Sequence, residues 1–232
     1  MTKMNTYIHC RNDLPFSDEI ILKIQKNMDD IFASFSANIL LSVGDIAQLF
    51  PIHSVNIKKQ FLLGTHAGDI SSDLLLLPIK KRTIDICFLP FTLDYIDDSY
   101  QLIREIDRVL MHDGYVVLLC CNPFSLLFFR YFLRTKNKLF PCNYGLYTPF
   151  RLLDWFQLLG YELFTMKSIT YQTLFFNDEF VDHIYDWLLR ILPYNGSIYT
   201  LVMQKKSIPM TLKREGLSRY YSFKNKKQVF NS

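Results

Sequence analysis

Residues 39–50, ILLSVGDIAQLF, place a glycine directly after a short apolar run, an arrangement that brings backbone close to a bound cofactor. Gly44 ends the run, and a glycine has no Cβ to keep a ligand away. Nucleotide-binding loops of this kind usually carry a second and a third glycine, and neither follows here. The sequence therefore leaves open whether this loop still holds a cofactor. Asp45 is a weaker candidate for ligand contact.

The cysteines and histidines form no pattern that is typical of a catalytic or metal site. No C-x-x-C pair, H-E-x-x-H motif, Cys/His cluster or Ser-His-Asp order stands out. Asp182 and His183 are interpreted as surface residues rather than as a catalytic pair. We predict reduced, buried thiols, no metal ligand and no identifiable catalytic residue. The five cysteines are Cys10, Cys87, Cys120, Cys121 and Cys142.

Short apolar runs predict the strands of a sheet. Almost continuously apolar runs are typical of parallel strands that are covered on both faces. The clearest lie at 38–43, 83–90 and 114–122, and others are SVNIKK, QFLLGT, YELFTMKSITYQT and SIYTLVMQKK.

Apolar residues at helical spacing predict helices over 17–36, 97–114, 148–160 and 178–193. In the second helix Leu102, Ile106 and Val109 share one face, and Gly114 is expected to end it. Strand, helix and strand in this order form a βαβ unit. We predict one α/β domain over 1–206, with insertions at 123–147 and 173–196, and a C-terminal tail over 207–232.

The positive charge is concentrated at the C-terminal end. Residues 204–232 hold eight Lys/Arg and one acid, a net charge of +7, so a total of +4 leaves −3 for the remaining residues. We interpret the tail as solvated rather than as a contact for nucleic acid or anionic membrane. The sequence contains neither an apolar run of roughly 18 residues nor a signal-peptide pattern, and we expect a cytoplasmic protein.

Residues 73–114 resemble the central signature of class I S-adenosylmethionine-dependent methyltransferases, in the type 11 branch. That signature runs D-x-x-x-L-P-F, F-D, L-E-H-L and R-E-I-x-R-V-L-x-P-G-G. The matching residues are Asp73, Leu77, Pro78, Asp85, Leu93, Arg104, Glu105, Ile106, Arg108, Val109, Leu110 and Gly114. Weaker similarity extends over 39–206, and QKKSIPMT (204–211) resembles the end of a small divergent bacterial subset.

The resemblance implies a Rossmann-like sheet, mostly parallel with a late antiparallel strand, and helices on both faces. It implies S-adenosylmethionine as cofactor at the carboxyl ends of the first strands. Asp73 would accept a hydrogen bond from the adenine amino group, and Leu74 would offer its backbone N–H. Segment 90–95, beginning with Pro90 and Phe91, would form a wall beside the reactive methyl group. Asp69 competes with Asp73, but the spacing to Pro78 favours Asp73.

Three features depart from the family pattern. The family's first motif is G-x-G-x-G, and its three positions hold Gly44, Ile46 and Gln48 here. We therefore predict a degraded loop in which the Ile46 and Gln48 side chains project where the cofactor would lie. Only 29 positions separate Gly44 from Asp73, so we expect a helix to be missing or reduced to a turn. No acid ends the second strand to bind ribose hydroxyls, and His53, Ser54 and Asn56 are weaker candidates. Arg104, Glu105 and Arg108 are interpreted as an exposed helix face.

Two functions remain open from the sequence. The first is a methyltransferase of unknown acceptor, with a small or apolar molecule as the expected partner because 123–147 is rich in Phe and Tyr. The second is a methyltransferase-like binding module that no longer turns over. The oligomeric state and the role of the tail are not predicted.

Overall fold

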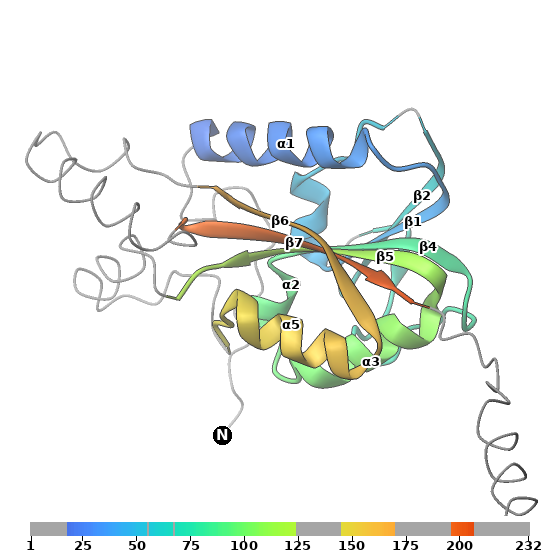
Figure 1. Cartoon of the computed structure of the whole chain (residues 1–232). Helices are drawn as coiled ribbons and strands as arrows, with labels where there is room; N and C mark the ends of the chain where they lie inside the picture. Colours follow the sequence, from blue (N-terminus) through green and yellow to red (C-terminus); the bar gives the residue numbers. More distant parts are fainter. Residues whose placement is uncertain (1–17, 55, 67, 124–144, 170–195, 207–232) are drawn as a thin grey trace, which may run out of the picture.

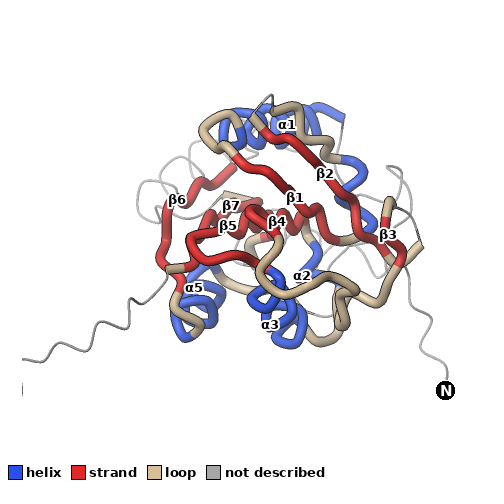
Figure 2. Tube along the Cα trace, turned by 90° about the vertical axis from the view of Figure 1, so that its right-hand side faces the viewer, coloured by secondary structure: helices blue, strands red, loops and turns tan. Residues whose placement is uncertain are grey.

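The centre of the molecule is a seven-stranded sheet in the order β3-β2-β1-β4-β5-β7-β6 (Figures 1 and 2). The structure is a computed structural model that describes residues 18–54, 56–66, 68–123, 145–169 and 196–206. The strands are β1 (Ala37–Val43), β2 (Ile57–Gly64), β3 (Ile70–Ser71), β4 (Ile84–Pro90), β5 (Leu110–Cys121), β6 (Tyr161–Ile169) and β7 (Ile198–Lys205).

The strand directions confirm the predicted α/β sheet. Strands β1 to β5 pair in parallel, whereas β7 runs antiparallel to both of its neighbours, β5 and β6. The last strand in the chain is therefore the antiparallel one. The carboxyl ends of β1 to β5 lie at one edge of the sheet, which is where open α/β sheets bind ligands.

Helices cover both faces of the sheet, as predicted (Figure 1). One face carries α1 (Asp18–Phe32) and the 3-10 helix η2 (Asp45–Leu49), and the other carries α2 (Thr92–Tyr95), α3 (Ser99–Val109) and α5 (Pro149–Leu158). Because successive strand side chains point to opposite faces, each central strand contributes to two cores. Leu40, for example, packs with α1, and Leu41 packs with α3.

Helix α3 forms where its periodicity predicted it. Asp98 caps its start by accepting a hydrogen bond from Gln101 N at 2.8 Å, and Leu102 and Ile106 are fully buried. The predicted stop at Gly114 is wrong, because the helix ends at Val109 and Gly114 lies inside β5. A Cβ at Gly114 would lie 2.9 Å from the carbonyl oxygen of Asp85, so this glycine permits close strand packing.

The two crossovers before β4 are short, which confirms the expected loss of a helix. The connection from β1 to β2 contains η2 in place of an α-helix, and β2 joins β3 through residues 65–69 without a helix. The two strands predicted at SVNIKK and QFLLGT are wrong, since the pairing residues form one continuous strand, β2. As a result His53, Ser54 and Asn56 precede β2 and lie at its amino end.

Several predicted segments fall outside the described residues, namely the helix at 178–193, most of both insertions and the tail. None of the helices in the described part of the chain is long and apolar enough to cross a membrane. The expected cytoplasmic location stays a prediction.

Candidate functional site

The carboxyl edge of the sheet brings together three of the predicted site segments. Gly44 follows β1, Asp73 follows β3, and Pro90 is the last residue of β4 with Phe91 directly after it. His53 is not part of this group, because it precedes β2 and is exposed at the opposite edge. Asp69 precedes β3.

The loop after β1 has wound into η2, and this changes what its side chains do. Gly44 has a φ of 102°, which favours glycine, and its N–H donates to the carbonyl of Leu63 at 2.7 Å. The prediction that Ile46 projects into the ligand space is wrong, because its side chain is 1% exposed and packs in the core beneath α1. Gln48 is exposed. A helical turn directs Ile46 and Phe50 to the same buried face.

Asp45 carries a carboxylate to the end of β2. It is 3% exposed and accepts hydrogen bonds from Thr65 N at 2.8 Å, from His66 N at 3.2 Å and from the Thr65 hydroxyl. No acidic residue was predicted at the end of β2. In the structure the carboxylate of Asp45, from the loop after β1, lies there. Thr65 and His66 were missed at the sequence level because two short strands were predicted where β2 runs on to Gly64.

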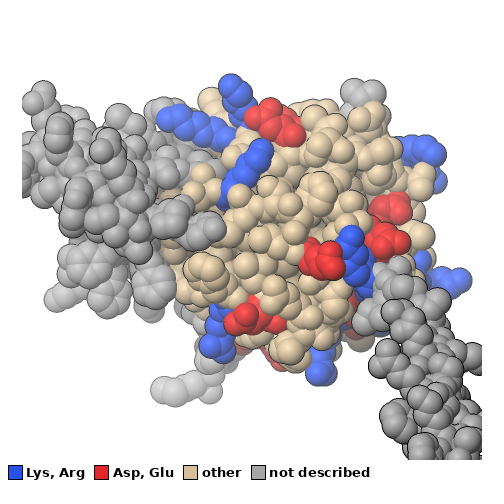
Figure 3. Space-filling model, in the orientation of Figure 1, with Lys and Arg blue, Asp and Glu red and all other residues tan. Residues whose placement is uncertain are grey.

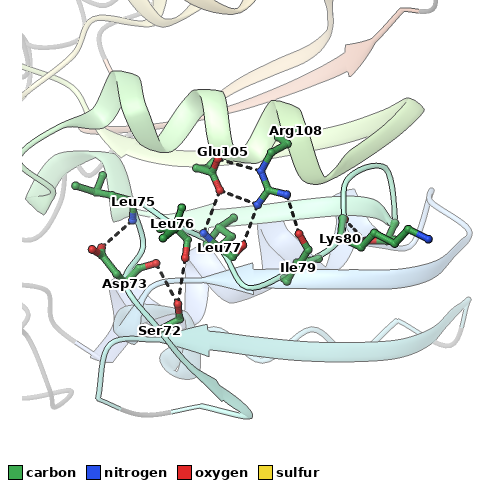
Figure 4. Close-up of polar contacts among 10 residues, drawn as sticks. Ser72, Asp73, Leu75, Leu76, Leu77, Ile79, Lys80, Glu105 and Arg108 are labelled. Carbon is green, nitrogen blue, oxygen red and sulfur yellow. Dashed lines mark hydrogen bonds and ion pairs between the residues drawn. The ribbon is translucent and has the colours of Figure 1, made fainter.

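Asp69 and Asp73 have different surroundings. Asp69 accepts from Leu62 N at 2.9 Å, and its own N–H donates to the Leu62 carbonyl at 2.8 Å, so it holds the outer edge of β2. Asp73 is exposed, and its Oδ1 accepts from Leu75 N at 2.9 Å within its own turn (Figure 4). Leu74 buries its side chain in the core on the α3 side.

The loop after Asp73 is held by an ion pair on α3 (Figure 4). Glu105 Oε2 accepts from Leu77 N at 3.0 Å and lies 2.7 Å from Arg108 Nη2. Arg108 donates to the carbonyl oxygens of Leu77 and Ile79, both at 2.8 Å. The Arg108 hydrogen bond lowers the pKa of the Glu105 carboxyl despite its partial burial. We call this set of four residues the loop clamp.

The loop clamp corrects the interpretation of this helix face as simply exposed. Glu105 is 8% exposed, and its contacts with the loop backbone explain why acid and base stand three residues apart. Arg104 points elsewhere, with its guanidinium 4.8 Å from the centre of the Tyr100 ring.

The segment after β4 is fixed to both neighbouring strands. Phe91 adopts a left-handed φ of 56°, its N–H donates to Leu119 O at 2.6 Å, and its side chain is fully buried. Thr92 donates its hydroxyl to the Val43 carbonyl at 2.6 Å. Pro90 and Phe91 therefore support the edge from within and present no exposed side chain to it.

Asp94 in α2 is a fully buried carboxyl group. Its Oδ2 accepts from Cys121 N at 3.0 Å, and Oδ1 has no hydrogen-bond partner among the described residues. Burial raises the pKa of Asp94 from 3.8 to about 8, and the Cys121 hydrogen bonds oppose that shift only in part.

The three described cysteines, Cys87, Cys120 and Cys121, are free and buried, as predicted. No cluster of metal-binding side chains occurs in the described ranges.

The space beside Gly44 tests how well this edge fits a cofactor. A Cβ built on Gly44 would lie 2.2 Å from Tyr95 Oη and 2.8 Å from Thr92 Oγ1. The absence of a side chain on Gly44 thus lets Thr92 and Tyr95 of α2 pack directly against the loop. At the Asp73 side the exposed carboxylate and its turn are suited to an adenine amino group. The Asp73 side therefore fits the adenine of S-adenosylmethionine, whereas beside Gly44 the Tyr95 hydroxyl fills one part of the edge.

Comparison with known proteins agrees with this geometry. A family model described as "Methyltransferase domain" matches residues 45–118. The uncharacterized protein YafS of Escherichia coli K12 is 28% identical over 209 residues, which is 88% of this chain and 83% of YafS.

Solved structures share the fold. An S-adenosylmethionine-dependent methyltransferase of Archaeoglobus fulgidus superimposes with a TM-score of 0.56 at 13% identity, over 82% of this chain and 95% of that one. Geranyl diphosphate C-methyltransferase of Streptomyces coelicolor, solved with S-adenosyl-L-homocysteine, has a TM-score of 0.50 at 13% identity, covering 86% and 89%. Residues 45–118 therefore match the methyltransferase family model, and the sheet shares its fold with these solved structures.

Proposed function

We propose that the protein is an S-adenosylmethionine-dependent methyltransferase that acts on a small or apolar acceptor. The observation that carries this proposal is the edge itself. Gly44, Asp73 and segment 90–95 follow three different strands and meet at the carboxyl ends of the sheet. The loop clamp fixes the turn after Asp73 to α3.

The residues at this edge need only bind and orient. The cofactor supplies the reactive methyl group together with its leaving group, so a methyltransferase requires little acid–base assistance. In this proposal Asp73 accepts a hydrogen bond from the adenine amino group, and Leu74 offers its backbone N–H. Asp45, Thr65 and His66 lie at the end of β2, the position from which ribose hydroxyls would be held.

The acceptor class rests on sequence composition. Segment 123–147, rich in Phe and Tyr, directly follows β5 at the carboxyl edge. A nucleic-acid or anionic-membrane partner finds no support on the face in Figure 3, where basic and acidic side chains of the described residues are interspersed. A non-catalytic binding module is not favoured by the family match.

Calorimetry with S-adenosylhomocysteine tests the cofactor site. Asp73→Ala removes an acceptor of a charge-assisted hydrogen bond and should weaken binding by roughly ten- to a hundredfold. Gln48→Gly is the matched control, because Gln48 is exposed on η2 and its truncation should change the affinity little. Tight binding that survives Asp73→Ala would overturn the assignment of Asp73. Absence of binding to the wild type at millimolar ligand would overturn the proposed function.

Transfer is tested separately with methyl-labelled S-adenosylmethionine and a bacterial lysate that is afterwards divided into polar small-molecule, apolar small-molecule, protein and nucleic-acid fractions. Label in the apolar fraction supports the proposed acceptor class. Label confined to protein or nucleic acid would contradict it. Binding without transfer to any fraction would favour the binding module.

A further inference from the structure

The Tyr95 hydroxyl occupies an unusual position at the carboxyl edge. It lies where a side chain on Gly44 would begin, 2.2 Å from the Cβ position, and it is buried. The Thr92 hydroxyl and the Asp45 backbone lie beside it and interact with it, although neither makes a hydrogen bond of ordinary geometry. Burial and the nearby Asp45 carboxylate raise the pKa of Tyr95, so the phenol stays neutral.

Contacts of poor geometry replace the lost contact of a buried hydroxyl with water only in part. Packing of the ring does not require the oxygen, since the ring already contacts both cores of the sheet. The position of the hydroxyl beside the loop after β1 points to an effect on what that loop can bind.

The backbone that carries Tyr95 is held on several sides. Thr92 binds the Val43 carbonyl, Asp94 binds Cys121 N, and the Ser99 hydroxyl donates to Leu93 O at 3.0 Å. Helix α2 cannot shift away from Gly44 without breaking these bonds. Rotation of the Tyr95 side chain opens space beside Gly44 and leaves these bonds intact.

The order of the strands shows which part of a ligand is affected. Asp73 follows β3, and Gly44 follows β1, with β2 between them and β4 beyond. A ligand whose adenine lies at Asp73 extends toward β1 and β4, so the end remote from the adenine reaches Gly44. In S-adenosylmethionine and S-adenosylhomocysteine that end is the amino-acid portion.

We propose that Tyr95 limits the affinity of this edge for the amino-acid end of the cofactor, because its hydroxyl fills the space beside Gly44. This inference rests on the proposed function and deepens it. Binding of the full cofactor requires the Tyr95 side chain to rotate out, whereas an adenosyl ligand without the amino-acid portion binds with the hydroxyl in place. The protein thus retains Gly44, but the Tyr95 side chain fills the space that the glycine leaves open.

Tyr95→Phe tests this by removing one oxygen and leaving the ring. We expect the affinity for S-adenosylhomocysteine to rise about tenfold, equivalent to roughly 1.4 kcal/mol, since the ligand no longer competes with the hydroxyl. The affinity for 5′-methylthioadenosine, which lacks the amino-acid portion, should stay within about twofold. Tyr100→Phe, an exposed tyrosine on α3, is the control and should change neither. Thermal unfolding of each variant verifies that it is folded.

Each remaining outcome decides the matter. Weaker or unchanged binding of S-adenosylhomocysteine by folded Tyr95→Phe, with the wild type binding it, overturns this inference and leaves the proposed function intact. Equal gains for both ligands also overturn it, since the amino-acid end would then not be involved. If Tyr95→Phe fails to fold, the hydroxyl is structural and the inference is wrong. No binding of either probe to wild type and variant overturns the inference and the proposed function together.

Discussion

At the scale of single residues, Asp94 is the group whose chemistry depends most on its surroundings. It is fully buried beside the Cys120 thiol and the Tyr199 hydroxyl, and the pKa values of both groups are raised well above their ordinary ranges, first of all by burial. Both neighbours therefore stay neutral around pH 7. With a pKa of about 8, Asp94 holds a proton at neutral pH in the folded protein and loses it on unfolding.

This difference makes stability depend on pH. Between about 3.8 and about 8 the folded state binds one proton more than the unfolded state, so the free energy of unfolding falls as the pH rises through that window. Asp94→Asn keeps an acceptor for Cys121 N–H and removes the titration. We expect the melting temperature of the wild type to fall from about pH 5 to about pH 8, and that of Asp94→Asn to change much less. Parallel curves for the two proteins would show that Asp94 does not carry the effect.

Individual positions also show what the sequence could not disclose. Gly44 was found because it ends an apolar run, and Asp73 was found through the family resemblance; they follow β1 and β3. The burial of Ile46 could not be predicted, because it depends on the loop closing into a 3-10 turn over the α1-side core. Asp45 was recognised only as a weak candidate, since its contact with Thr65 joins loops twenty residues apart.

At the scale of elements, apolar periodicity predicted helices and strands best where a long stretch of the element buries its apolar residues. Strand β4 formed close to its predicted limits, whereas helix α3 ends five residues before its predicted stop and β5 begins four residues before its predicted start. Prediction failed where tertiary contacts set the limits, as at Gly114, which lies in β5 because its small size suits the neighbouring strand. The loop clamp was missed for a similar reason, since charged residues on a helix are commonly solvated and their partners lie almost thirty residues away.

The loop clamp gives a prediction at this scale. Arg108→Ala removes donors to the Leu77 and Ile79 carbonyls and the partner of Glu105. We expect a loss of about 1–3 kcal/mol in the free energy of unfolding, measured by urea denaturation. Binding of S-adenosylhomocysteine should also weaken, because the turn that carries Asp73 loses its support.

Two matched variants sharpen this experiment. Arg104→Ala, on the same helix but stacked on Tyr100, should cost less than about 1 kcal/mol. Arg108→Lys should not restore the wild-type stability, since an ammonium group cannot span two carbonyls and a carboxylate as the guanidinium fork does. Equal effects of Arg104→Ala and Arg108→Ala would argue that the clamp contributes nothing beyond surface charge.

At the scale of the whole molecule, the described residues form two apolar cores that share one sheet. The same strands, β1, β4, β5 and β7, supply alternate side chains to the core under α1 and to the core under α3 and α5. A disturbance on one face therefore removes support from strands that the other face also needs. We expect the domain to unfold as one cooperative unit, with both cores lost together.

Ile106→Asp tests this coupling from the α3 face. Ile106 is fully buried in the centre of that core, and an unpaired carboxylate there costs several kcal/mol, comparable with the roughly 5–15 kcal/mol that stabilises a whole domain. We expect insoluble protein, or soluble protein without a cooperative thermal transition in circular dichroism. Leu158→Asp, at a position 80% exposed on α5, is the matched control and should melt close to the wild type. A soluble Ile106→Asp protein with a sharp transition would show that the α3 face can be lost without the sheet, and the single cooperative unit would be wrong.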